Sequence, residues 1–320
     1  MTTSPLPTID RDELVALLSQ LVSINSVNPA YARSCNEKAM AELIQDLLSQ
    51  WKIPFETQLV EPDRSNVIAR LPGGGRGTLL FEAHMDTVSI EKMAIDPLAP
   101  KREGDRLYGR GACDTKGGMA AMLYALKRVH QAGPPTASTI LFAATVDEEH
   151  GFQGISHLVA SGIRADGAVV AEPTDLDVVV AHKGVLRWRI TVRGKAAHSS
   201  KPHLGVNAIV NMMHIIEAIE RELMPKLTAS DHPLLGPATL SVGTIHGGTQ
   251  VNTVPQACSI EIDRRLLPGE TSETVWKEFQ QVLDKQMALH PSLDVVMEDP
   301  MLEDGPLATD PQANVVAVAE

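Results

Sequence analysis

The segment 139–151, TILFAATVDEEHG, constrains the fold of this chain more than any other. Its first half, 140–146, is a short apolar run of the length expected for a strand buried on both faces of a parallel sheet. Its second half begins with four ionisable residues, 147–150. Such side chains are costly to bury in an apolar interior, so we expect them at the end of the strand, where water or a cation can satisfy them.

Two further apolar runs end in the same way. Residues 79–83 lead into a histidine and an aspartate, and residues 167–171 lead into a glutamate. In open α/β sheets, binding sites form outside the carboxyl ends of the strands. The sequence therefore predicts one site at one edge of a sheet, formed by side chains of the metal-ligand type: His84, Asp86, Glu148, Glu149 and Glu172.

A sixth candidate, Asp114, lies in the glycine-rich segment 109–118, just before a helical pattern over 119–130. An isolated aspartate at this position could simply cap the helix. The flanking glycines allow close approach of the backbone, and together with the acidic strand ends they favour a metal-binding role. Another glycine-rich run, 72–77, matches neither common phosphate-binding pattern and is interpreted as a hairpin-type turn.

Near the start of the chain, Asp10 is expected to cap a helix, with Glu13 reaching back to complete a capping box. A second amphipathic helix is expected over 37–51 and a strand over 66–71. The pattern changes at Gly184, where apolar and polar residues alternate as in a half-exposed antiparallel strand.

The elements expected after Gly184 follow the order β-α-β-β-α-β as far as residue 297. The helices are expected over 206–223 and 270–289. The simplest fold for this order is the ferredoxin-like split βαβ arrangement. It leaves an edge strand exposed, and pairing of that edge with a second copy would produce a homodimer.

Length and charge limit the classes of protein and partner. The 320 residues favour about two domains. With 28 Lys and Arg against 40 Asp and Glu, the net charge of −12 argues against nucleic acid or an anionic membrane as a partner. Three scattered cysteines favour a reducing cytoplasm, and neither a targeting segment nor a run that could span a membrane is recognised. We expect a cytoplasmic protein.

Histidine with several carboxylates is a ligand set that suits zinc or a similar divalent ion, whereas structural zinc sites usually contain cysteines. Two ions roughly 3.5–4 Å apart, bridged by Asp114, could hold a hydroxide and polarise a carbonyl, while Glu148 and Glu149 act as base and ligand. The alternative is a solvated acidic loop, but charged residues repeated at strand ends favour function. Other histidines are interpreted as surface or packing residues: His130, His157, His214, His232 and His290.

Together these segments resemble the M20 metallopeptidase family, which includes acetylornithine deacetylase, succinyl-diaminopimelate desuccinylase, aminoacylase and carboxypeptidase G. The matching motifs run in family order as far as Pro268: residues 84–86, 109–118, 147–149, 171–174 and 197–200. The resemblance implies an α/β zinc-hydrolase catalytic domain over 1–182. It implies an inserted ferredoxin-like α+β lid and dimerisation domain over 183–298, with 299–320 beginning the return to the catalytic domain.

The resemblance also implies a role for each candidate residue. His84 and Glu172 would bind one zinc ion, Glu149 the other, and Asp114 would bridge them. Asp86 would orient His84, as carboxylates beside ligating imidazoles do.

In the family, a lid histidine stabilises the oxyanion, commonly in the partner subunit's site, and His198 matches it. Asn252 and Arg265 match substrate-contact positions, and the planar fork of an arginine suits a substrate carboxylate. The implied reaction is zinc-dependent hydrolysis of an amide bond in N-acyl amino acids or small peptides, of the deacetylase, desuccinylase or peptidase type. Metal-bound hydroxide would be the nucleophile and Glu148 the general base.

Two points stay open at this stage. Co²⁺ or Mn²⁺ could replace zinc, and the acyl group and amino acid of the substrate are not identified. The alternative function is a non-catalytic metal-dependent binding protein, or an inactive fragment of such an enzyme.

Family members supply another zinc-binding histidine after the lid, close to the C-terminus, but no histidine follows His290 here. On this basis we expect a truncated chain whose second zinc site is incomplete. It would hold at most one zinc ion well, have low activity and tend to aggregate.

Overall fold

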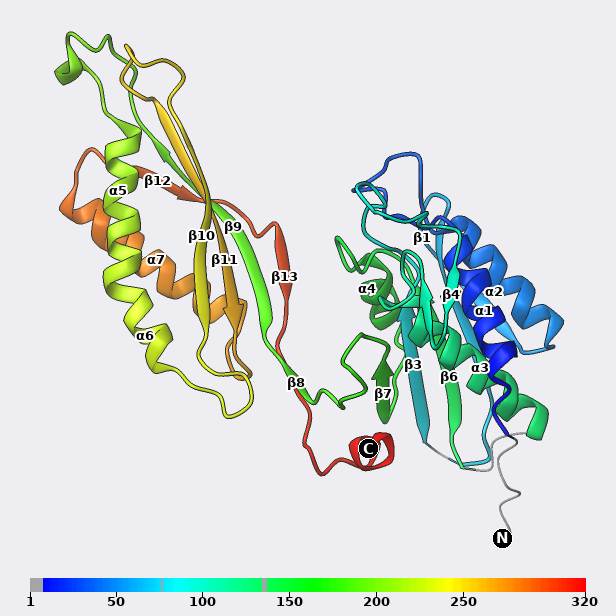
Figure 1. Ribbon diagram of the computed structural model, residues 1–320. Coiled ribbons are helices and arrows are strands. Elements are labelled where there is room, and N and C mark those ends of the chain that lie inside the picture. Colours follow the sequence, from blue (N-terminus) through cyan, green and yellow to red (C-terminus); the bar gives the residue numbers. More distant parts are fainter. Residues whose placement is uncertain (1–7, 76, 134–136) are drawn as a thin grey trace. The chain divides into compact units, whose positions relative to one another are not determined.

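The computed structural model describes residues 8–75, 77–133 and 137–320 (Figure 1). The chain divides into two compact units, Met1–Asp177 and Val178–Glu320. Among the described residues, no helix combines the length and the apolar character needed to cross a membrane. The three cysteines are free thiols.

The first unit contains a five-stranded sheet with the order β1-β2-β6-β3-β7. Its strands are β1 (Phe55–Glu61), β2 (Arg64–Leu71), β3 (Thr78–His84), β6 (Thr139–Thr145) and β7 (Gly167–Val170). Strand β3 runs parallel to β6 and β7, whereas β2 runs antiparallel to β1 and β6. The expectation of a buried β6 is confirmed, but the sheet is mixed and not purely parallel.

The interpretation of 72–77 as a hairpin-type turn is wrong. Strands β2 and β3 do not pair with each other, because β6 lies between them and pairs with both. The connection instead crosses the end of β6, and a Cβ atom at Gly73 would lie 2.2 Å from the carbonyl oxygen of Ser138. One residue of this segment, Arg76, lies outside the described residues.

Helices cover both faces of this sheet. They are α1 (Arg11–Ser23), α2 (Lys38–Gln50), α3 (Lys116–Ala132) and α4 (Gln153–Ala160), and a separate hairpin comprises β4 (Lys101–Glu103) and β5 (Arg106–Tyr108). The main core packs α1, α2 and α3 against one face, with Leu21, Ile44 and Leu123 fully buried. A smaller cluster packs Leu158 of α4 against the other face.

The N-terminus of α1 differs from the expected capping box. Asp10 does cap the helix, since its carboxylate accepts hydrogen bonds from the backbone N–H groups of Asp12 and Glu13. The side chain of Glu13 forms an ion pair with Lys127 on α3. A tertiary ion pair has therefore replaced the local contact that the sequence predicted.

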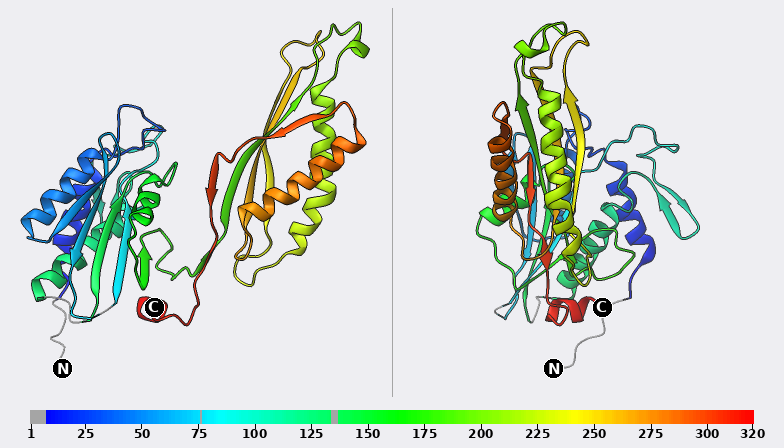
Figure 2. Two further views of the ribbon diagram at one scale, coloured as in Figure 1. Left: turned by 180° about the vertical axis from the view of Figure 1, so that it is seen from behind. Right: turned by 90° about the vertical axis from the view of Figure 1, so that its left-hand side faces the viewer.

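The second unit has the predicted ferredoxin-like order. Its sheet runs β10-β11-β9-β12, with β9 (Gly184–Arg193), β10 (Thr239–Gly247), β11 (Ala257–Leu266) and β12 (Asp294–Met297). Helices α5 (Ala208–Ala218) and α7 (Ser272–Leu289) lie on one face of it (Figure 2). The first helical region extends further than expected, through a π-helical turn (Ile219–Leu223) into α6 (Met224–Ala229).

The rest of this unit consists of short elements. They are β8 (Ala181–His182), a 3-10 helix (Pro202–Leu204), β13 (Leu302–Asp304), β14 (Leu307–Ala308) and α8 (Asn314–Ala319). Strand β13 pairs with β9, and β14 pairs with β8.

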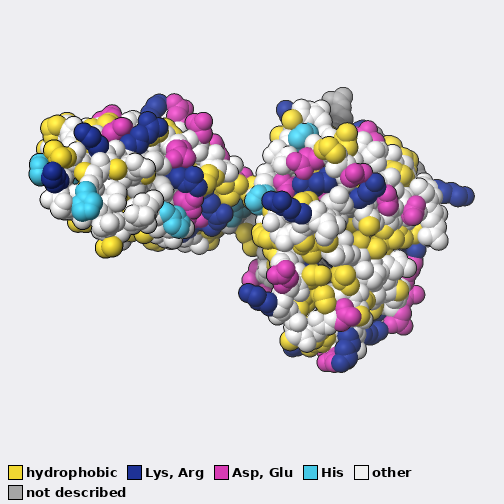
Figure 3. All heavy atoms as spheres, turned by 90° about the horizontal axis from the view of Figure 1, so that it is seen from above, with side chains coloured by type: hydrophobic (Ala, Val, Ile, Leu, Met, Phe, Trp, Pro, Cys, Tyr) yellow, Lys and Arg dark blue, Asp and Glu magenta, His cyan; other side chains and the backbone are white. Residues whose placement is uncertain are grey.

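On the face seen in Figure 3, acidic and basic side chains are interspersed among hydrophobic ones.

The core of the second unit is built around Trp188 on β9. This side chain is fully buried, and its ring meets the edge of Phe279 on α7 with the ring centroids 4.7 Å apart. Its indole N–H has no hydrogen-bond partner within the described part of the chain. The residue therefore contributes through packing and aromatic contact alone.

We predict that Trp188→Ala destabilises the second unit by about 3–5 kcal/mol, the usual cost of truncating a large buried aromatic side chain. Trp188→Phe should cost clearly less, because it keeps an aromatic ring beside Phe279 and removes the unpaired N–H. Urea unfolding followed by far-UV circular dichroism measures both. Equal destabilisation by the two variants would contradict this account of the core.

Candidate metal centre

The carboxyl ends of β3, β6 and β7 meet at one edge of the first unit's sheet, because β3 pairs in parallel with both neighbours. His84 is the last residue of β3. Glu148 and Glu149 lie in the turn that follows β6, and Glu172 lies just after β7. Asp114 precedes α3. The six predicted residues of this site are therefore brought to the same edge, with Asp86 following β3.

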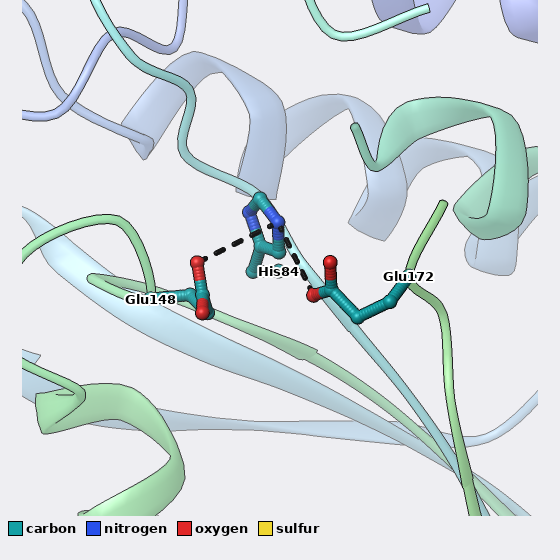
Figure 4. A group of neighbouring side chains, drawn as sticks. All are labelled: His84, Glu148 and Glu172. Atoms are coloured by element: carbon teal, nitrogen blue, oxygen red, sulfur yellow. Dashed lines mark ion pairs between the residues drawn. The ribbon is translucent and has the colours of Figure 1, made fainter. Parts of the chain in front are cut away.

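The ring of His84 is the centre of the cluster. Its Nε2 atom lies 3.1 Å from Asp114 Oδ1, 3.8 Å from Glu148 Oε2 and 3.8 Å from Glu172 Oε1. In Figure 4 the imidazole points between the carboxylates of Glu148 and Glu172.

Two sets of potential metal-ligand atoms share this histidine. One set is His84, Glu148 and Glu172, the other is His84, Asp114 and Glu149, and within each set the atoms lie within 4.8 Å of one another. The grouping differs from the implied ligand sets in three respects, because Glu148 joins the first group, Asp114 belongs to the second group alone, and His84 belongs to both.

Asp86 links the end of β3, which carries His84, to the turn that carries Glu148 and Glu149. Its carboxylate accepts hydrogen bonds from the backbone N–H of Glu148 at 3.1 Å and of Glu149 at 3.0 Å. Nδ1 of His84 lies 3.0 Å from the backbone carbonyl oxygen of Asp86 and 3.5 Å from its Oδ1. With Nδ1 directed to Asp86, the other ring nitrogen faces the open side of the cluster, as a metal ligand requires.

A buried polar network beneath the cluster was not predicted from the sequence. Asn28 donates to Asp86 and Asp147, and Arg64 forms ion pairs with Asp147 and Glu37. Arg64 could have been recognised from the sequence, because it is a charged residue at the start of an apolar strand. No signal of this kind marks Asn28, which precedes a proline between the two predicted helices.

Burial and charge shift the pKa values in the cluster. Burial lowers the pKa of His84, but its hydrogen bonds to Asp114 and Asp86 outweigh this effect and raise the pKa to about 11. Burial raises the pKa of Glu148 to about 7, and it does the same for Glu172. Burial therefore favours the neutral forms of Glu148 and Glu172, whereas the neighbouring carboxylates favour the charged form of His84.

The donor chemistry fits a divalent cation. The imidazole of His84 is only 2% exposed, whereas the side chain of Asp114 is 51% exposed, so the carboxylates form the side open to solvent. A buried nitrogen ligand with several oxygen ligands and no cysteine suits zinc or a similar ion in a catalytic site. Such a cation would offset the negative charge of the four carboxylates that lie around His84.

The remaining predicted residues belong to the second unit. His198 and Asn252 lie in neighbouring loops, since His198 bridges to Thr253 and the N–H of Ser199 donates to the Asn252 carbonyl at 2.9 Å. Nδ1 of His198 lies 2.8 Å from Ser200 Oγ.

Arg265 on β11 forms an ion pair with Asp263 at 2.8 Å, which leaves its side chain half exposed. Its neighbour Arg264 is buried and pairs with Glu270, so the two adjacent arginines have different surroundings.

Comparison with known proteins gives matches to both units. Residues 180–290 match the M20 peptidase dimerisation domain, and residues 66–227, which include the cluster from His84 to Glu172, match peptidase family M28. A probable succinyl-diaminopimelate desuccinylase from Staphylococcus epidermidis is 30% identical, over 96% of this chain and 78% of its own length. An acetylornithine deacetylase from Vibrio campbellii is 35% identical, over 77% of this chain and 65% of its own length.

The fold agrees with these matches. A tripeptidase from Staphylococcus aureus superimposes with a TM-score of 0.74 and 22% identity, covering 98% of this chain and 81% of that structure. The desuccinylase match extends along almost the whole sequence, and the dimerisation-domain match falls on the ferredoxin-like unit. The chain therefore belongs to the M20 family of metallopeptidases, a family of hydrolytic enzymes.

Proposed function

We propose that this protein hydrolyses an amide bond in N-acyl amino acids or small peptides at a centre of divalent cations, where the cation bound by the imidazole of His84 is held more firmly than the second. The observation that carries the proposal is the convergence of His84 with the carboxylates of Asp114, Glu148, Glu149 and Glu172 at the edge formed by the carboxyl ends of three strands. The names of the desuccinylase and deacetylase relatives support an acyl amino acid as the substrate. Zinc is the cation we propose, with cobalt or manganese as substitutes.

Four side chains would hold the two cations. His84 and Glu172 would bind one, Glu149 the other, and the exposed carboxylate of Asp114 would lie between them. Cations bound there supply two effects, since they lower the pKa of a coordinated water and polarise a carbonyl group. Asp86 positions the site through its contacts with His84, Glu148 and Glu149.

Glu148 is the proposed general base. Burial raises its pKa to about 7, which suits a group that must accept and release a proton near neutral pH. The hydrogen bond from its backbone N–H to Asp86 supports a fixed position for it. Its carboxylate would take a proton from the attacking water and deliver that proton to the leaving amine, so that the acid and the amine are released without a net change in the enzyme.

Three residues of the second unit also have proposed roles. We propose that His198 stabilises the oxyanion and that Asn252 and Arg265 contact the substrate. A carboxylate of the substrate would have to share or displace the ion pair between Arg265 and Asp263. The guanidinium fork can bind a carboxylate through two parallel hydrogen bonds.

We also propose a homodimer formed through the second unit. Residues 180–290 match a peptidase dimerisation domain, and β10 is the long edge strand of that unit's sheet. An exposed edge that can pair with a second copy supports this assembly. The cytoplasmic location stays a prediction.

The first test concerns the base. Glu148→Gln should keep its bound metal and lose at least about 100-fold in kcat, the usual range for loss of a general base. Glu149→Gln should lose metal. A screen of N-acetyl and N-succinyl amino acids and dipeptides identifies the substrate, and elemental analysis gives the metal content. If Glu148→Gln loses metal as Glu149→Gln does, Glu148 is a ligand and the base has been misassigned.

The second test uses pH. The pKa values of Glu148 and Glu172, both about 7, mean that these carboxyl groups are protonated at low pH and ionised at high pH in the metal-free protein. A cation must displace those protons, so Co²⁺ should raise Tm more at about pH 8.5 than at about pH 5.5. At 100 times Kd the stabilisation would be about 2.7 kcal/mol.

Thermal unfolding with and without Co²⁺, from a baseline in EDTA, measures this shift. Glu172→Gln should reduce the shift at the higher pH, whereas Glu303→Gln, an exposed glutamate of the second unit, should not. An equal shift at both pH values would contradict the proposed site.

The third test concerns assembly. Light scattering should give the mass of a dimer. Ile245→Lys places a charge on an exposed position of β10 and should favour the monomer. Leu59→Lys changes an exposed position on β1, the edge strand of the first unit's sheet, and should leave the mass unchanged. A monomer for the parent protein would refute the proposal.

A further inference from the structure

A single buried amide, that of Asn28, connects the two acidic segments beneath the metal centre. Its Nδ2 atom donates to Asp86 Oδ2 at 2.7 Å and to Asp147 Oδ1 at 2.9 Å, and the residue is only 1% exposed. Its Oδ1 accepts the N–H of Ala30, and its own N–H donates to the carbonyl of Thr87. Asn28 is thus held in place by Ala30 and by Thr87, which follows β3, while both of its amide donors are directed at carboxylates.

Each of these two carboxylates contacts or directly precedes residues of the proposed site. Asp86 contacts His84 and accepts the N–H groups of Glu148 and Glu149. Asp147 directly precedes those two glutamates and has a left-handed backbone conformation, with φ of 69°, where the chain leaves β6. The orientation of Asp147 therefore determines the direction in which the two glutamates leave the strand.

Few contacts hold the side chain of Asp147. Its Oδ1 atom accepts from Asn28 and from Arg64, while its buried Oδ2 atom has no hydrogen-bond partner among the described residues. Loss of the amide of Asn28 would leave Arg64 as the remaining donor to this side chain in the described network. It would also remove the link between the side chains of Asp147 and Asp86.

The chemistry of an asparagine suits this position. Two buried carboxylates that lie close together repel each other, and a neutral group with two N–H donors can hold both without adding charge. An aspartate at position 28 would remove both donors and add a third carboxylate. Arg64 cannot replace the amide, because its guanidinium is directed at Asp147, Glu37 and Glu61 and not at Asp86.

We infer that Asn28 is a positioning residue for the metal centre. It fixes the end of β3, which carries His84, relative to the turn that carries Glu148 and Glu149, so that residues of both segments can bind the same cations. This inference rests on the proposed function, which assigns those residues to metal binding and catalysis. Asn28 itself contacts neither the cations nor the substrate.

The test compares Asn28→Ala and Asn28→Asp with Asn25→Ala in the full chain. Asn25 lies on the same segment and contacts Cys35 and the N–H of Val27, but it makes no contact with the cluster. Co²⁺ serves as the probe, because its visible absorption spectrum reports the geometry of its ligands. Titration gives the Co²⁺ affinity, and the identified substrate gives kcat and KM.

We expect Asn28→Ala to weaken Co²⁺ binding by about 10–100-fold and to change the Co²⁺ spectrum, as loss of a supporting hydrogen bond around a metal site does. Asn28→Asp should be weaker still, and Asn25→Ala should match the parent. The kcat of Asn28→Ala should fall with little change in KM. Asn28→Ser, which keeps one donor, should bind Co²⁺ with intermediate affinity and provides the measurement if the alanine variant does not fold.

Parent-like affinity and spectrum in Asn28→Ala, or in Asn28→Ser if that variant is used, would overturn the inference. Altered Co²⁺ binding in a protein that hydrolyses none of the substrates would support the positioning role and refute the proposed reaction. A parent protein that binds no Co²⁺ would overturn both.

Discussion

The buried ion pairs of Arg64 are the interaction on which the rest of the first unit depends. Arg64 is almost fully buried, as are its partners Glu37 and Asp147. Burial disfavours its charge, but the carboxylates outweigh that effect and raise its pKa further above the usual range. Removing one partner of such a group typically costs about 3–5 kcal/mol, because the remaining charges stay buried without compensation. The ion pairs join the start of α2, the start of β2 and the turn after β6.

Further carboxylates lie between these ion pairs and the edge of the sheet where the metal centre is proposed. Arg64 and Asn28 both donate to Oδ1 of Asp147, and the carboxylate of Asp86 accepts hydrogen bonds from Asn28 and from the backbone of the acidic turn. Beyond them lie Glu148, Glu149 and Glu172, whose pKa values are raised mainly by burial. The inner carboxylates thus find their partners within the protein. The outer ones surround the imidazole of His84, and this arrangement suits the binding of a divalent ion.

Much of the fold could be predicted from periodicity because both units follow strong local patterns. The alternation in β9 identified its buried face, and the order of elements identified the ferredoxin-like sheet. Two of the errors share one cause. The turn over 72–77 and the cap at Glu13 were judged from neighbouring residues alone, whereas β6 and Lys127, which decide them, come from distant parts of the chain.

The sequence by itself determined the chemistry of the site. It supplied a histidine and carboxylates at strand ends, and parallel pairing of β3 with β6 and β7 was enough to bring them together. Only the tertiary structure decided how these groups are supported. Asn28 meets its two partners across 58 and 119 residues, and Arg64 meets Asp147 across 83. Such contacts depend on the order of strands in the sheet and on the packing of α1 and α2. A buried charge accepts whichever partner that packing provides, so no local pattern in the sequence records the choice.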